Sequence, residues 1–167
     1  PREGERNGVD YYFIVREEFE ARVSRGEFLE YAEVHGNLYG TLKSEVISHI
    51  EAGRDVLLDL DVQGADFVRS QTDPFIREAH VDIFILPSND EELTRRLNLR
   101  GTETPEQLSL RLRNAHEEMR HWPDYRYTIV SGDREADFAT FCAIFTGERC
   151  RSSRLRKSPG ETTFPGV

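Results

Sequence analysis

Three groups of residues in this chain have side chains and spacings that can do chemistry. The first group comprises Arg2, Glu5, Gly8, Tyr11, Glu30, Tyr39 and Thr41. An arginine with two tyrosine hydroxyls can hold a phosphate, because the guanidinium makes a charge-assisted pair with it and the phenols add donors. The carboxylate of Glu30 can accept two hydrogen bonds from a guanine edge, where adenine offers no matching pair of donors. Alternatively, Glu30 lies on the solvent face of an alternating strand and the tyrosines are peripheral aromatics.

The second group is a pair of carboxylates, Asp59 and Asp61, at the end of the apolar run 55–61 and just before Gln63 and Gly64. Ligands of open α/β sheets bind beyond the carboxyl ends of strands, where paired carboxylates can hold a cation or accept from a sugar and a base. Strand alternation places both aspartates on the same side. The alternative is that they cap the helix that follows.

The third group is rich in arginine. Residues 95–113 contain Arg95, Arg96, Arg100, Arg111 and Arg113 but only two acids, Glu103 and Glu106. The segment 101–104 interrupts two predicted helices, as a hinged lid requires, and such arginines can clamp a phosphoryl group during its transfer. The alternative is a pair of solvated helix faces with i, i+4 ion pairs.

Two kinds of structure are predicted to position these groups. Residues 1–42 contain short antiparallel pieces: a β-prone run at 11–15, a helix at 17–25, a strand at 28–34 and an extended piece through Tyr39, before a helix at 44–52. Beyond them, apolar runs at 55–61, 81–86 and 127–130 indicate buried parallel strands. Helices predicted at 64–70, 90–99, 105–120 and 135–150 alternate with those strands.

We therefore expect an α/β protein in which a small subdomain, residues 1–42, is joined to a parallel-sheet core at 43–150. The core includes a lid at about 95–113, and a polar tail follows at 151–167.

Composition narrows the function further. The 167 residues carry 22 Lys and Arg against 31 Asp and Glu, a net charge of −9, which argues against a general binder of nucleic acid or membrane surfaces but allows a compact anionic ligand. No apolar run is long enough for a membrane span. Cys142 and Cys150 would lie about 12 Å apart on one helix, too far for a disulfide. We expect buried or inert thiols in a reducing cytoplasm.

Several motifs are absent from the sequence. It has no G-x-x-x-x-G-K-[ST] phosphate loop, no G-x-S-x-G nucleophile motif and no Cys/His cluster with metal-ligand spacing. We interpret His116, His121 and Trp122 as packing and surface residues rather than ligands.

The motifs together resemble the guanylate kinase family. Arg2-x-x-Glu5-x-x-Gly8-x-x-Tyr11 is similar to part of its signature, and four further segments follow in the order and spacing of the family. They are FLEYAEVHGNLYGT (28–41), DVLLDLDVQG (55–64), FILPS (84–88) and RRLNLRGTET (95–104). The resemblance covers about residues 1–150. It implies a nucleoside monophosphate kinase fold of the P-loop NTPase type.

The resemblance also implies roles for individual residues. Arg2, Tyr11 and Tyr39 would bind the phosphate of GMP, Glu30 and Thr41 would read guanine, and Asp59 and Gly64 would lie near the nucleoside. Asp61 would lie near a monovalent cation or a metal-bound water. Arg96, Arg100 and Arg111 would contact the phosphates of ATP and the transferred group, with Mg²⁺ bridging the phosphates. Ser131 stands where the family commonly has an asparagine that contacts adenine.

The expected activity is transfer of the terminal phosphoryl group of ATP to GMP, giving ADP and GDP. The first strand and phosphate loop of the family have no counterpart here, so we expect an N-terminally truncated chain that is inactive alone. Alternatives are a non-catalytic guanylate-kinase-like interaction module, an inactive fragment that binds only GMP, and another nucleoside monophosphate kinase. Glu30 and Thr41 argue against the last, and a phosphate-loop motif encoded upstream would favour the enzyme.

Overall fold

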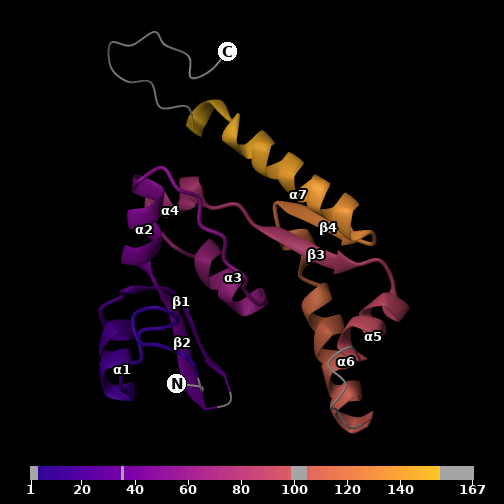
Figure 1. Ribbon diagram of the computed structural model, residues 1–167, viewed down its shortest axis with the longest axis horizontal. Coiled ribbons are helices and arrows are strands. Elements are labelled where there is room, and N and C mark those ends of the chain that lie inside the picture. Colours follow the sequence, from indigo (N-terminus) through magenta and orange to yellow (C-terminus); the bar gives the residue numbers. More distant parts are fainter. Residues whose placement is uncertain (1–3, 35, 99–104, 155–167) are drawn as a thin grey trace. The chain divides into compact units, whose positions relative to one another are not determined.

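The computed structural model describes residues 4–34, 36–98 and 105–154, and it consists of two compact units (Figure 1). One unit ends at Val81 and the other begins at Asp82. The predicted subdomain boundary near residue 42 stays a prediction.

The N-terminal unit is a β-hairpin with helices packed around it. Its elements are α1 (Arg16–Ser24), β1 (Phe28–Val34), β2 (Asn37–Leu42), α2 (Lys43–Glu51), α3 (Val62–Arg69) and α4 (Pro74–Ala79). The strands β1 and β2 are antiparallel, with Glu30 opposite Thr41 and Ala32 opposite Tyr39. Because side chains alternate along a strand, Glu30, Thr41 and Tyr39 share one face of the hairpin.

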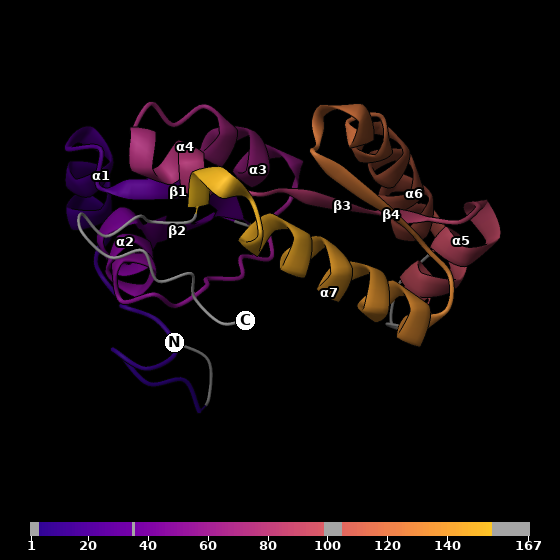
Figure 2. The ribbon, with the colours of Figure 1, turned by 90° about the horizontal axis from the view of Figure 1, so that it is seen from above.

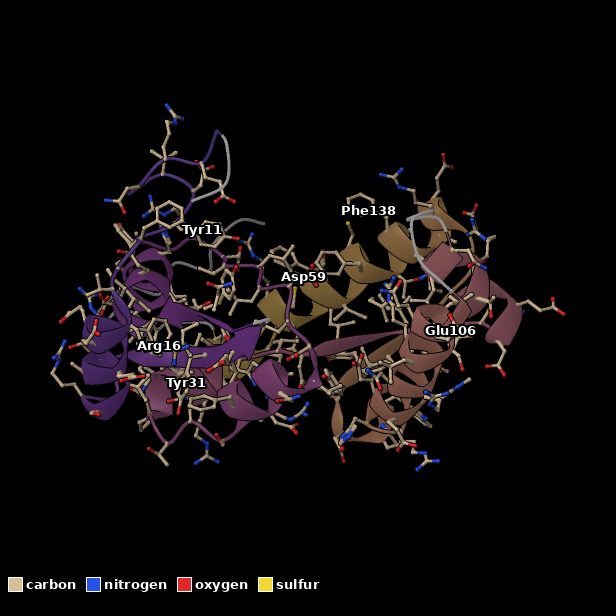
Figure 3. The ribbon with its side chains drawn as sticks, turned by 90° about the horizontal axis from the view of Figure 1, so that it is seen from below. Tyr11, Arg16, Tyr31, Asp59, Glu106 and Phe138 are labelled. Atoms are coloured by element: carbon tan, nitrogen blue, oxygen red, sulfur yellow. The ribbon has the colours of Figure 1, made fainter. Side chains whose placement is uncertain are left out.

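The opposite face of the hairpin packs on the core of this unit. Leu29 is only 2% exposed and belongs to a buried cluster with Val46, Val68 and Ile76. The ring of Tyr31 meets Phe67 of α3 edge to face, with 5.1 Å between the centroids. Figure 3 shows Tyr31 and Tyr11 on opposite sides of the hairpin. Core packing on one face therefore leaves the other face for ligand chemistry.

The C-terminal unit is built on two parallel strands. Its elements are β3 (Ile83–Pro87), α5 (Asp90–Asn98), α6 (Pro105–Met119), the 3-10 turn Trp122–Asp124, β4 (Tyr127–Ser131), α7 (Arg134–Arg149) and the 3-10 turn Ser152–Arg154. β3 and β4 pair from Ile83–Tyr127 to Pro87–Ser131. Figure 2 shows α7 running alongside these strands. Both strands end at the same edge of the sheet, and there Ser131 contacts Arg96 of α5.

Most predicted elements are confirmed within a few residues, and β1 has the predicted bounds. The strand predicted at 55–61 is wrong, because that segment has no regular secondary structure. A strand requires hydrogen bonds to a neighbour, and no described strand pairs with this segment. The β-prone run at 11–15 likewise forms only an isolated bridge, between Asn7 and Tyr11.

Two further expectations are corrected or completed by the structure. Cys142 and Cys150 are unpaired as predicted, but both are exposed rather than buried. Of the helices that the structure describes, none has the length and apolar character needed to span a bilayer.

Candidate functional site

Glu30 and Thr41 form a polar pair across the hairpin. The Thr41 hydroxyl donates to Glu30 Oε1 at 2.6 Å, and Glu30 is only 9% exposed. This burial contradicts the alternative in which Glu30 lies on a solvent face. Within the described ranges, Thr41 is the one side chain hydrogen-bonded to this carboxylate. Glu30 therefore keeps acceptor capacity on its second oxygen.

Tyr11 and Tyr39 lie together. Their rings meet edge to face, with 6.2 Å between the centroids, and they are 50% and 41% exposed. Tyr39 is two residues from Thr41 on β2 and shares its face. The structure thus brings together four of the residues predicted to bind GMP. Arg2 lies outside the described residues.

The two predicted aspartates have different environments. Asp61 is the N-cap of α3, where its Oδ1 accepts the backbone N–H of Gly64 at 2.8 Å. For Asp61 the capping alternative is therefore realised. Asp59 is exposed on the irregular segment 55–61 and is labelled in Figure 3. Gly64 is buried, and a Cβ there would lie 3.3 Å from Leu60 Cβ, so its small size permits close packing of the helix start.

Two side chains hold Arg96: Glu92, one turn earlier on α5, and Ser131, at the end of β4. Its Nε donates to Glu92 Oε1 at 2.6 Å, and its Nη2 donates to the hydroxyl of Ser131 at 2.7 Å. Arg95 also donates to Glu92. Hydrogen bonds from Arg95 and Arg96 lower the pKa of Glu92 to about 2.

Of the other two predicted arginines, the structure describes Arg111 only. Arg111 lies on α6 and is half-buried, whereas Arg100 falls outside the described residues together with the hinge 101–104. Helices α5 and α6 are linked by a contact between His116 Nε2 and Asp90 Oδ1, 3.0 Å apart. Ion pairs within α5 do occur, as the alternative for this group predicts, but Arg96 also reaches across to β4.

Ser131 is nearly inaccessible, with 3% of its surface exposed. Its hydroxyl donates to Asp137 Oδ2 at 2.5 Å while accepting from Arg96. Neither Glu92 nor Asp137 was predicted as a site residue. The i, i+4 spacing from Glu92 to Arg96 was a usable signal, but the contact from Arg96 to Ser131 spans 35 positions and depends on the fold.

A second ionic cluster, also unpredicted, fixes the end of α7. Glu148 is 5% exposed, accepts the Tyr127 hydroxyl at 2.8 Å and lies within 3.5 Å of three arginines, Arg126, Arg151 and Arg154. Burial raises the pKa of Glu148, but hydrogen bonds from Tyr127 and Arg151 outweigh it and leave the pKa below its usual value.

The described residues contain no group of three or more His, Cys, Asp or Glu side chains that could hold a metal ion. A cavity of about 410 Å³ opens in the N-terminal unit beside Tyr12, Phe13, Leu42 and Glu45. It is lined by none of the predicted site residues, so it does not mark this site.

The chain is an α/β protein, and comparison with known proteins defines its family. The sequence model of the guanylate kinase family matches residues 1–145. The guanylate kinase of Alkalilimnicola ehrlichii is 43% identical over 162 residues, which make up 97% of this chain and 77% of that protein. The guanylate kinase of Clostridium tetani is 41% identical over 158 residues, 95% of this chain and 74% of that protein.

A solved structure agrees. The crystal structure of guanylate kinase from Anaplasma phagocytophilum superposes with a TM-score of 0.69 and 36% identity, covering 92% of this chain and 73% of that one. This chain belongs to the guanylate kinase family, whose members are ATP:GMP phosphotransferases.

Proposed function

We propose that the hairpin of the N-terminal unit binds GMP and that the arginines of α5 and α6 contact the phosphates of ATP. The observation that carries this proposal is the buried pair of Glu30 and Thr41 on the hairpin face that also carries Tyr39. A buried carboxylate with spare acceptor capacity needs a donor partner, and a nucleobase edge can supply one.

Guanine fits this carboxylate better than adenine does. The guanine edge presents two adjacent donors, N1–H and the exocyclic amine, to the carboxylate of Glu30. Adenine presents an acceptor, N1, beside its amine, so one carboxylate oxygen would face a lone pair. Thr41 fixes the orientation of the carboxylate from the other side.

The phosphate of GMP is assigned to the phenols of Tyr11 and Tyr39 together with Arg2. The exposure of the two tyrosines, 50% and 41%, supports this assignment, because a ligand can reach these residues. Asp59, exposed after the hairpin, is assigned to the nucleoside, and Gly64 to the close packing beside it.

For the second substrate, ATP, we assign its phosphates and the transferred group to three arginines, Arg96, Arg100 and Arg111. Transfer of a phosphoryl group depends mainly on positioning and on neutralising charge on its oxygens, which guanidinium groups provide. Mg²⁺ is expected to arrive with ATP, held chiefly by phosphate oxygens. Asp61 keeps one carboxylate oxygen beyond its cap and is assigned to a monovalent cation. The exposed free cysteines are consistent with a reducing cytoplasm.

The guanine assignment is tested by replacing Glu30 with glutamine. Gln keeps the size but retains one acceptor and places an amide donor against a guanine donor. Loss of a two-bond base contact costs about 1–3 kcal/mol, so the preference for GMP over AMP should fall by roughly one to two decades. Calorimetric affinities for GMP and AMP measure this.

The matched control is Glu33→Gln, at an exposed position of the same strand. It should leave the GMP-to-AMP ratio unchanged. If Glu30→Gln also leaves that ratio unchanged, Glu30 does not read the base and the proposal fails.

A further inference from the structure

The hydroxyl of Ser131 sits between two charged groups in the C-terminal unit. Arginine has only donors, so Ser131 must accept from Arg96 Nη2. The single hydroxyl proton then goes to Asp137 Oδ2, 2.5 Å away. Asp137 is held in turn by the backbone N–H of Gly132, which donates to Oδ1 at 3.2 Å. The order of donors from Arg96 through Ser131 to Asp137 is therefore fixed.

This arrangement leaves the side chain of Ser131 no proton to donate to a base. Its one proton is donated to Asp137, and with 3% exposure its oxygen is closed to a ligand. A role in contacting adenine, which the resemblance implied for this position, does not fit these contacts. The carboxylate of Asp137 instead polarises the hydroxyl and makes its oxygen a stronger acceptor for Arg96.

The two bonds to Arg96 define the direction of its guanidinium. Nε is fixed by Glu92 and one proton of Nη2 by Ser131, so two of the five donors are engaged. Across the part of the chain that the structure describes, the other three, two on Nη1 and one on Nη2, have no hydrogen-bond partner. They form the end of the fork that can grip two oxygens of a phosphate. The Arg96 side chain is 37% exposed, so a ligand can reach it.

We propose that Ser131 and Asp137 are positioning residues that hold Arg96 ready for the phosphates of ATP. This inference rests on the proposed role of Arg96. A long side chain fixed before the substrate arrives loses less freedom on binding and needs no reorientation during transfer. Glu92 and Ser131 hold it from α5 and from the end of β4, so its direction is tied to both elements.

The first experiment detects the positioning without catalysis. The NMR signal of the Arg96 Nη2 protons, identified by its loss in Arg96→Lys, should be sharp and slow to exchange in the 167-residue chain, because Ser131 accepts from this nitrogen. Ser131→Ala and Asp137→Asn should broaden it or speed its exchange, whereas Ser131→Thr should preserve it. An unchanged signal in Ser131→Ala would show that Ser131 does not hold Arg96, and the proposal would be wrong.

The control for this measurement is Ser109→Ala. The Ser109 hydroxyl accepts from Arg113 Nη1 at 2.8 Å on α6, a similar serine–arginine contact outside the site. Its removal should leave the Arg96 signal unchanged. A change there would mean that the signal reports general loosening rather than positioning, and would count against the proposal.

The second experiment places the pair in the reaction. Because the chain alone is expected to be inactive, coupled assays of ADP release use a form that also carries the phosphate loop of the family. In that form, Ser131→Ala and Asp137→Asn should each lower kcat/KM for ATP roughly tenfold and leave KM for GMP unchanged. Ser131→Thr, which keeps the hydroxyl, should retain the wild-type activity. In an Arg96→Ala background, Ser131→Ala should cause no further loss, because the residue it positions is gone.

These outcomes distinguish failure of the proposed role of Arg96 from failure of the positioning proposal. If Arg96→Ala retains full activity, the proposed role of Arg96 fails. If Arg96→Ala loses activity but Ser131→Ala lowers it equally in both backgrounds, Arg96 keeps its role and the positioning proposal is overturned.

Discussion

Tyr39 is the residue through which phosphate binding is most directly tested. Its hydroxyl is assigned to the phosphate of GMP, and hydrogen bonds to charged groups contribute about 1.5–3 kcal/mol. Tyr39→Phe keeps the ring that packs on Tyr11 and removes only the hydroxyl. We expect GMP affinity to fall roughly tenfold and guanosine affinity to stay constant, both measured by calorimetry.

The control at this scale is Tyr31→Phe. Tyr31 lies on the opposite face of the hairpin, against Phe67, so loss of its hydroxyl should change neither affinity. Equal losses of GMP and guanosine in Tyr39→Phe would contradict the phosphate assignment and point to a role of the ring.

Individual residues also show where sequence reasoning succeeds. Residue type and spacing place four residues in one predicted group. The structure brings them together in two contacting pairs, Glu30 with Thr41 and Tyr11 with Tyr39. Asp137 was not predicted, because nothing local links it to Arg96. Partners that depend on tertiary packing carry no periodic signal in the sequence.

At the scale of elements, Gly40 lies where the two strands of the hairpin approach each other closely. A Cβ there would lie 2.8 Å from Phe28 Cδ1 and 2.9 Å from the backbone oxygen of Glu30. The backbone oxygen cannot rotate away, so Gly40→Ala should force β1 and β2 apart. We expect a loss of about 1–3 kcal/mol in the free energy of unfolding, with weaker GMP binding because Glu30 and Thr41 separate.

Gly147→Ala provides the contrast. Gly147 lies inside α7, where an added Cβ meets no atom within 4 Å, and alanine favours helix over glycine. This variant should gain about 0.5–1 kcal/mol in urea unfolding. A stable Gly40→Ala protein with normal GMP affinity would show that the hairpin tolerates the extra atom.

The helices and strands also show where prediction of secondary structure from the sequence pattern fails. The predicted hairpin and parallel strands are confirmed where each strand has its partner within the described residues. The run 55–61 has the composition of a strand but no described partner, and composition alone does not create a hydrogen-bonded neighbour. The short helix α4 was missed, although Asp73 as its cap and Pro74 at its first turn are a helix-start signal.

At the scale of the whole molecule, two acidic residues matter for the pH dependence of stability because arginines lie next to them. The chain has a net charge of −9, yet Glu92 and Glu148 are each surrounded by arginines in the C-terminal unit. The pKa of Glu92 is lowered to about 2, and the pKa of Glu148 lies below its usual value. These two carboxylates resist protonation in the folded state more than in the unfolded chain.

Acid should therefore destabilise the protein through these two groups. Between the ordinary carboxyl pKa of 4.5 and about 2, the unfolded chain binds more protons than the folded one, so stability falls as pH falls. Above pH 4.5 their contribution is fully present. Urea unfolding followed by the fluorescence of Trp122, the only tryptophan, should show this decline for the C-terminal unit between about pH 5 and pH 3.

The variant Glu148→Gln identifies the source of that decline. At pH 7 it should lower the free energy of unfolding by about 1–3 kcal/mol, because the three neighbouring arginines lose their carboxylate. As the pH falls below 4.5, the gap between the variant and the wild-type chain should narrow, because the unfolded wild-type chain gains a proton at Glu148 more readily than the folded one does. Glu135→Gln, at an exposed position of α7, should stay parallel to wild type throughout. A constant gap between Glu148→Gln and wild type from pH 7 to pH 3 would show that Glu148 stabilises the fold by packing and not by its charge.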